Sequence, residues 1–189
     1  MAIAGIGLAM TLLLVAWPNP QEAPKKIKSN GAGRVDRHLA NAAGPFISFE
    51  IIPPMRGGDV KGLLSLIDDL VKYRPPFIDI TSHAAEVMYD ETPQGIQRRV
   101  KRKRPGTLGV CALMQNKYHI DAVPHILCQG FTREETEDFL IELRYLGIDN
   151  VLALRGDPPK GQERWTKTDG GLEYSYELVE ILRDDYDFA

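Results

Sequence analysis

The chain has 189 residues, 43% of them hydrophobic and 26% charged, which is the composition of an ordinary soluble globular protein with room for one domain. This composition argues against an intrinsically disordered chain. A net charge of -3 gives no overall attraction to nucleic acid or to an anionic membrane, so a basic feature that binds such a partner must be local.

The N-terminal part of the chain differs in composition from the rest. Residues 1–17 carry no charge and resemble a short membrane anchor or the apolar part of an export signal. However, no basic residues precede this apolar segment, and its length is marginal for a bilayer core of about 30 Å. The alternative is a spurious extension from a misassigned start. Residues 18–45, which are largely polar over 21–44, are expected to form a linker.

From residue 46 onward, β-rich runs alternate with helical patterns four times. The first run, 46–54, carries one carboxylate, Glu50, and ends in two prolines, which cannot extend a strand ladder. Apolar residues at helical spacing over 60–71 then predict an amphipathic helix. A second strand is expected at 77–80, and hydroxyl groups and an imidazole follow it.

The connection after the second strand is the longest. It is expected to contain a basic helix over 95–104 and a second apolar segment over 108–114. The lysines and arginines of 98–104 suggest a nucleic-acid patch at first sight. Because no aromatic residues interleave with them, a solvated helix face is favoured, and no nucleic-acid partner is expected.

The third strand is expected at 122–128 and carries a single histidine, His125, in an apolar run. A lone histidine in such a run is often a hydrogen-bonded core residue, so its function stays open from the pattern alone. Thr132 and Glu135 fit a capping box at the start of the next helix. Gly147 stands where a left-handed residue is needed after the end of that helix.

The fourth strand begins at Val151 and ends abruptly at Arg155, Gly156 and Asp157, before two prolines. This is the pattern of a buried parallel strand that brings an acid to its C-terminal end, where βα-repeat proteins keep their chemistry. A loop over 158–171 then precedes a last helix. Together, the four strands end in polar groups and suggest one shared site.

These repeats predict an α/β fold with a parallel sheet and right-handed crossovers. No GxGxxG or GxxxxGK[ST] motif follows a strand, so the usual phosphate loop of an open nucleotide-binding sheet is absent. Residues 46–189 hold four βα units, whereas a complete eight-unit barrel needs about 250 residues. We therefore expect a partial TIM-barrel catalytic domain over 46–189, with about the first four units.

The two cysteines, Cys111 and Cys128, are too far apart for a CxxC motif, and each lies among apolar residues. This predicts buried free thiols and a reducing compartment. A cytoplasmic location is therefore expected. If residues 1–17 were an anchor, the lysines of the linker would still favour a cytoplasmic body, and a membrane partner is expected only in that case.

Three motifs together resemble the methylenetetrahydrofolate reductase family: FEIIPP at 49–54, VPHILC at 123–128 and LALRGDPP at 152–159. Members are flavoproteins that reduce 5,10-methylenetetrahydrofolate to 5-methyltetrahydrofolate, in one-carbon metabolism and methionine biosynthesis. The resemblance implies an oxidoreductase with a (β/α)8 barrel that binds FAD at its C-terminal face. It also implies NADH or NADPH as the reductant of the flavin, and it allows a homo-oligomer.

By position within these motifs, the resemblance implies two catalytic residues. Glu50 matches the general acid that helps to open the folate's five-membered ring to the iminium that accepts hydride. Asp157 matches the aspartate that lies between flavin and folate. The implied flavin-binding positions are Thr81, Ser82, Ala84, His125, Arg155, Gly156, Asp157, Tyr174 and Ser175.

Two other interpretations stay open. Glu50, His83, His125 and Asp157 could be ligands in a metal-dependent barrel hydrolase, although no close-spaced pair such as HxH is present, and no metal site is predicted. The chain could also be a non-catalytic fragment or an anchored adaptor. Half a barrel lacks the opposite wall of the site, so such a chain is expected to bind FAD poorly and to be inactive unless it is paired with a second half.

Overall fold

The computed structural model describes residues 33–84, 86–101, 104, 106–158, 163–186 and 188. The apolar segment predicted at 1–17 and the first part of the predicted linker, 18–32, lie outside these ranges. Among the helices that the structure describes, none is both long enough and apolar enough to cross a membrane.

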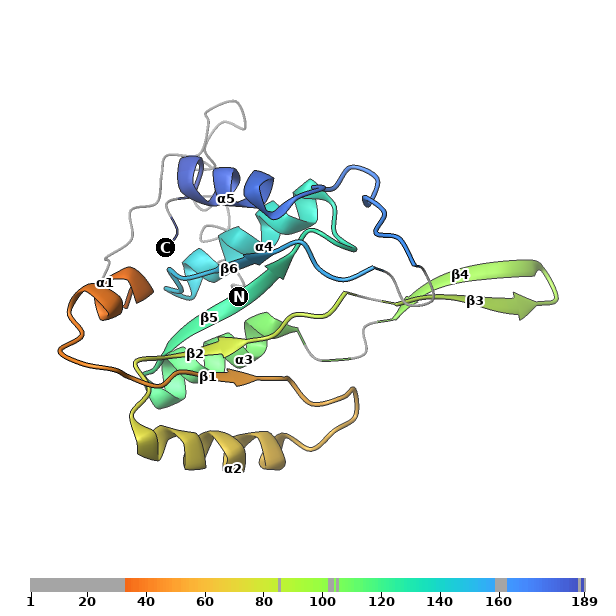
Figure 1. The fold of residues 1–189 in the computed structure, drawn as a ribbon. Helices are drawn as coiled ribbons and strands as arrows, with labels where there is room; N and C mark the ends of the chain where they lie inside the picture. The colour runs from red at the N-terminus through yellow and green to blue at the C-terminus, as the bar shows by residue number, and fades with distance from the viewer. Residues whose placement is uncertain are drawn as a thin grey trace, which may run out of the picture.

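Helices and strands alternate along most of the described chain (Figure 1). They are α1 (Val35–Ala40), β1 (Phe49–Ile51), α2 (Val60–Leu70), η1 (Val71–Tyr73), β2 (Phe77–Ile80), β3 (Glu86–Thr92), β4 (Gly95–Lys101), α3 (Thr107–Leu113), η2 (Met114–Tyr118), β5 (Asp121–Leu127), α4 (Arg133–Tyr145), β6 (Leu152–Leu154) and α5 (Ser175–Asp184). Strands β1, β2, β5 and β6 form one parallel sheet in that order. The predicted α/β fold with a parallel sheet is therefore confirmed.

One face of the parallel sheet forms the hydrophobic core with the helices. Ile51, Ile78, Ile80 and Ile126 lie in this core and are almost fully buried. The helical residues in the same core are Leu63, Ile67, Val110, Met114, Leu140, Leu143, Leu178 and Leu182. Because side chains alternate along a strand, the sequence neighbours of the core residues point to the opposite face of the sheet. That opposite face carries Glu50, Asp79 and His125.

The ends of α4 have the predicted caps. Thr132 Oγ1 accepts a hydrogen bond from the Glu135 N–H at 3.1 Å, and Glu135 Oε2 accepts one from the Thr132 N–H at 2.8 Å. At the other end, Gly147 has a φ of +70°, and the Ile148 N–H donates to the Leu143 carbonyl at 3.0 Å. This is a Schellman motif, which satisfies carbonyl groups that the helix leaves open.

The connection between β2 and α3 corrects one prediction. The basic helix expected over 95–104 is wrong, because β3 and β4 form an antiparallel hairpin there. A tight turn at Pro93 joins the strands, the Thr92 hydroxyl donates to the Gly95 carbonyl at 2.7 Å, and Gly95 has a φ of +117°. The expected helix took no account of the turn signal that Pro93 and Gly95 give. The apolar segment expected over 108–114 does form a helix, α3.

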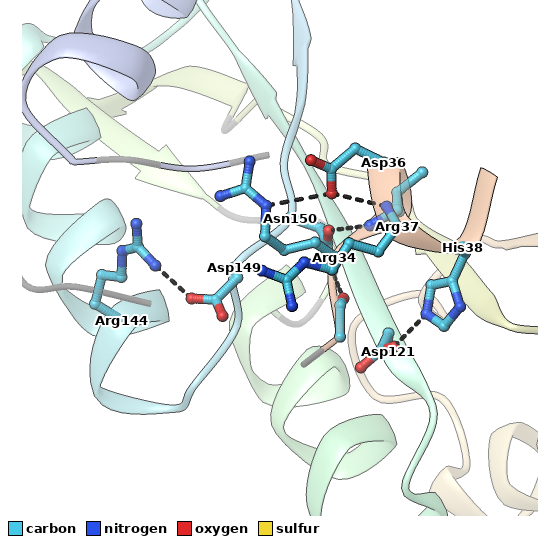
Figure 2. Close-up of polar contacts among 10 residues, drawn as sticks. Arg34, Asp36, Arg37, His38, Asp121, Arg144, Asp149 and Asn150 are labelled. Carbon is cyan, nitrogen blue, oxygen red and sulfur yellow. Dashed lines mark hydrogen bonds and ion pairs between the residues drawn. The ribbon is translucent and has the colours of Figure 1, made fainter. Parts of the chain in front are cut away.

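Polar contacts attach α1 to the amino end of the sheet (Figure 2). The Asn150 side chain, just before β6, accepts from the Val35 N–H at 2.8 Å and donates to the Gly33 carbonyl at 2.6 Å. His38 on α1 lies 2.6 Å from Asp121 at the start of β5. Residues 33–40 therefore pack on the sheet, although the sequence had assigned them to a linker.

A buried ion pair lies beside this network, between Arg144 at the end of α4 and Asp149 before β6 (Figure 2). Both side chains are almost completely shielded from solvent. The Arg144 guanidinium also donates to the Tyr186 carbonyl, and it lies 4.2 Å from the centroid of the Phe188 ring. Arg144 therefore links the end of α4 to the residues just before β6 and to the residues after α5.

Both cysteines are buried and free, as the sequence predicted. Burial raises the pKa of the Cys111 thiol to about 12. Burial, together with the nearby Glu177 carboxylate, raises the pKa of the Cys128 thiol to about 11. Both shifts favour the neutral thiol in the folded state. Their contribution to stability is present below about pH 8.5 and is lost as the pH rises towards 11.

Thiol labelling at pH 8 is therefore expected to be roughly 100-fold slower, or more, in the folded protein than in urea. Only the thiolate reacts, and its fraction falls about tenfold for each unit by which the pKa exceeds the pH. The reaction with an aromatic disulfide reagent measures this rate, and Cys111→Ser and Cys128→Ser separate the two thiols. Equal rates in folded and unfolded protein would contradict the burial of both groups.

Candidate functional site

Three titratable side chains converge on the sheet face that is turned away from the helices. Glu50 on β1 and Asp79 on β2 are cross-strand partners. The Nε2 atom of His125 on β5 lies 3.6 Å from Asp79 Oδ1 and 3.9 Å from Glu50 Oε2. The histidine is only 5% exposed, whereas 57% of the Glu50 side chain is exposed. The exposed carboxyl can thus meet a ligand while the imidazole lies behind it.

Two buried polar atoms in this region lack a hydrogen-bond partner among the described residues. They are His125 Nε2 and the hydroxyl oxygen of Thr81, the residue that follows β2. The backbone of Thr81 is held firmly, because its N–H donates to the Ile51 carbonyl at 3.0 Å and its carbonyl accepts from the Thr107 hydroxyl at 3.1 Å. Buried polar atoms are nearly always paired in native proteins, so these two are places where a ligand can supply the partner.

The loop after β2 meets the loop after β5. A Cβ added at Gly130 would lie 2.8 Å from Ala84 Cβ, and Gly130 has a φ of +83°. The Gly130 N–H donates to the Thr168 hydroxyl at 2.9 Å. Ser82 is partly buried in the same stretch as Ala84. These contacts bring the carboxyl ends of β2 and β5 close to the loop that follows β6.

The carboxyl end of β6 requires glycine at position 156. Gly156 has a φ of +84°, and a Cβ there would lie 2.9 Å from Gln129 Cβ. The Gln129 N–H donates to the Arg155 carbonyl at 3.1 Å, which extends the pairing of β5 and β6 beyond both strands. Asp157 follows immediately and is exposed. The close backbone approach therefore places an acidic side chain at the end of the sheet.

Arg155 lies between two aromatic rings. Its guanidinium carbon is 4.1 Å from the centroid of the Trp165 ring and 4.5 Å from that of Tyr174. Its Nε–H donates to the Glu173 carbonyl at 3.0 Å. Both distances are within the range of cation–π attraction. Arg155 and Tyr174, two of the predicted flavin-binding positions, are thus in contact, and Ser175 begins α5 directly after Tyr174.

The start of α5 is fixed by a carboxylate. Glu177 Oε2 accepts from the Glu173 N–H at 2.6 Å and from the Tyr174 N–H at 2.8 Å. These two backbone hydrogen bonds hold the pKa of Glu177 below its usual value. The Glu177 carboxylate therefore fixes the backbone conformation of Tyr174, whose ring contacts Arg155.

Sequence reasoning missed two residues of this region. Asp79 carried a signal, because it is the one polar residue in the strand at 77–80. Trp165 carried none, because nothing in a loop sequence shows which aromatic side chain will turn towards an arginine. The metal-ligand interpretation gains no support: among the described residues, no group of three histidine, cysteine or acidic side chains is arranged to hold a metal ion.

Comparisons with known proteins agree with the motifs. The family model "Methylenetetrahydrofolate reductase" matches residues 34–188. The "Methylenetetrahydrofolate reductase (NADH) 1" proteins of Arabidopsis thaliana and Zea mays are 34% and 32% identical over 139 residues, which are 74% of this chain and 21% of each relative. The "5,10-methylenetetrahydrofolate reductase" of Pectobacterium carotovorum is 28% identical over 163 residues, 85% of this chain and 47% of that relative. The chain thus spans about a fifth of the plant relatives and about half of the bacterial one.

Proposed function

Because this chain belongs to the methylenetetrahydrofolate reductase family, we propose that it supplies one wall of a flavin-dependent site that reduces 5,10-methylenetetrahydrofolate to 5-methyltetrahydrofolate. NADH or NADPH is the reductant. The observation that carries the proposal is the convergence of Glu50, Asp79 and His125 on the sheet face opposite the helical core, beside the unpartnered hydroxyl of Thr81.

The residues present fit an FAD cofactor. The unpartnered Thr81 hydroxyl and His125 Nε2 can bond to the polar edge of a flavin, and the backbone at Gly156 allows a close approach. The residues that would hold it are Thr81, Ser82, Ala84, His125, Arg155, Gly156, Asp157, Tyr174 and Ser175. Bound there, the flavin would supply hydride-transfer chemistry between the nicotinamide and the folate.

In this proposal Glu50 is the general acid. It would give its proton to the ring nitrogen that leaves when the five-membered ring of the folate opens. Its carboxyl is exposed enough to meet a substrate, and the Nε2 atom of the buried His125 lies 3.9 Å from it. Asp157, exposed at the end of β6, would accept hydrogen bonds from the donor edge of the pterin and disfavour additional negative charge near it.

We also propose a cytoplasmic location. The buried free thiols of Cys111 and Cys128 are suited to a reducing compartment. Membrane attachment through residues 1–17 is the alternative, and fractionation of cells that express the chain distinguishes the two.

Flavin binding tests the proposed function directly. Because the chain supplies only one wall of the site, it is expected to bind FAD weakly and to quench FAD fluorescence only at high protein concentration. Thr81→Val is expected to weaken this binding further, roughly tenfold, because it removes a hydroxyl hydrogen bond of about 1 kcal/mol or more while keeping the side-chain shape. Thr92→Val, in the turn of the hairpin, is the matched control. A chain that does not bind FAD, or equal affinities for the wild-type and Thr81→Val proteins, would contradict the proposed flavin site.

A further inference from the structure

We infer that Trp165 is a positioning residue, which together with Tyr174 holds the Arg155 guanidinium in one orientation for the ligand at the carboxyl end of β6. The inference rests on the proposed function for the identity of that ligand, a flavin. The orientation of Arg155 itself does not depend on it.

Two aromatic rings and Glu173 restrain the Arg155 guanidinium. The Trp165 and Tyr174 rings contact it with centroid distances of 4.1 and 4.5 Å. The Nε–H donates to the Glu173 carbonyl at 3.0 Å, and Nη2 lies 3.9 Å from the carboxylate of the same residue. Rings restrain the plane of the group, and the hydrogen bond restrains its rotation within that plane.

A restrained arginine is a better ligand than a free one. An arginine side chain has many rotamers, and binding must normally restrict them. A guanidinium has five N–H donors, and the described contacts of Arg155 involve only Nε and Nη2. We call Trp165 and Tyr174 the Arg155 clamp. Because the clamp holds the guanidinium in one orientation before the ligand arrives, less conformational entropy is lost on binding, which strengthens binding without any additional contact.

The face of the Trp165 ring carries this effect. The indole N–H is buried and lacks an acceptor among the described residues, and it cannot donate to the arginine because a guanidinium has no acceptor. The ring also packs against the hydrophobic core, which fixes its own position. Replacement by another aromatic ring should therefore preserve the clamp, and replacement by an aliphatic side chain should remove it.

The first test measures the clamp without a ligand. In the ¹⁵N-labelled full chain, the Arg155 Nε–H signal is expected to be shifted by the aromatic rings and protected from exchange with water. Trp165→Phe should keep most of both effects, and Trp165→Leu should lose them. Tyr145→Leu, which removes an exposed aromatic ring at the end of α4, is the matched control. Identical Arg155 signals in wild-type and Trp165→Leu proteins would overturn the inference.

The second test measures what the clamp does for flavin binding. Trp165→Leu is expected to weaken FAD binding about five- to thirtyfold, the range that corresponds to loss of a partly buried cation–π contact, and Trp165→Phe should restore most of the affinity. The chain has two tryptophans, so Trp17→Phe leaves Trp165 as the only one. Its emission should be quenched as FAD binds, because flavin absorbs in that range.

The outcomes separate the two proposals. Equal FAD affinity of the wild-type and Trp165→Leu proteins would overturn the positioning of Arg155 for flavin and leave the proposed function in place. A wild-type chain that shows the restrained Arg155 signal but binds no flavin would instead overturn the proposed function and support the clamp.

Discussion

Glu50→Gln is expected to slow the reduction of 5,10-methylenetetrahydrofolate by roughly 10²- to 10⁴-fold in the flavin-loaded protein paired with the opposite wall of the site, the usual contribution of a positioned general acid. Glutamine keeps the size and hydrogen-bonding shape of glutamate, but it has no proton to give to the leaving ring nitrogen. Reduction of the flavin by NADH or NADPH does not use this proton and should be unchanged. Stopped-flow absorbance of the two half-reactions measures both rates.

Asp79→Asn is the matched comparison for this variant. Asp79 and Glu50 flank the same imidazole, at 3.6 and 3.9 Å, but only 20% of the Asp79 side chain is exposed, against 57% for Glu50. The less exposed carboxylate is expected to affect the folate half-reaction less than Glu50 does. A larger loss of rate in Asp79→Asn than in Glu50→Gln would contradict our proposal, because it would indicate that the general acid is Asp79 on β2 and not Glu50 on β1.

Arg144→Met is expected to lower the free energy of unfolding by about 3–5 kcal/mol, because it removes the cation that pairs with the buried carboxylate of Asp149. It also removes the hydrogen bond to the Tyr186 carbonyl and the contact with the Phe188 ring. Urea unfolding followed by circular dichroism measures the change.

Two further variants make the stability result specific. Arg183→Met breaks an exposed pair with Asp184 and is expected to change stability by less than about 1 kcal/mol. Combining Arg144→Met with Asp149→Leu removes both charges, and should recover part of the lost stability. A small effect of Arg144→Met alone would mean that the Asp149 carboxylate finds solvent or another donor.

Local patterns predicted much of the fold. The strand at 77–80, the capping box at Thr132 and the free thiols could be predicted because each depends on neighbours in the sequence. The hairpin of β3 and β4 was missed because the turn signal of Pro93 and Gly95 was not weighed against the basic run that was assigned to a helix. The packing of α1 could not be predicted, since its partners Asp121 and Asn150 are distant in the sequence.

The candidate site was predicted less from patterns than from the resemblance of three motifs. A strand pattern shows that Glu50 and His125 share a face with other side chains, but it gives no distance between strands. The approach of His125 to Glu50 depends on the register of β1, β2 and β5, which only the folded sheet reveals. The contact of Trp165 with Arg155 depends on the path of a loop, for which the sequence has no periodic signal.

The attachment of α1 has a consequence for the order of folding. Asn150 bonds to Val35 and Gly33 at sequence separations of 115 and 117, so these bonds close some of the longest loops among the described hydrogen bonds. Such closures are entropically costly and tend to form late, after β5 and β6 have been assembled. These two hydrogen bonds should be among the first to break when the native state opens locally. Brief exposure of the amino end of the sheet would then precede global unfolding.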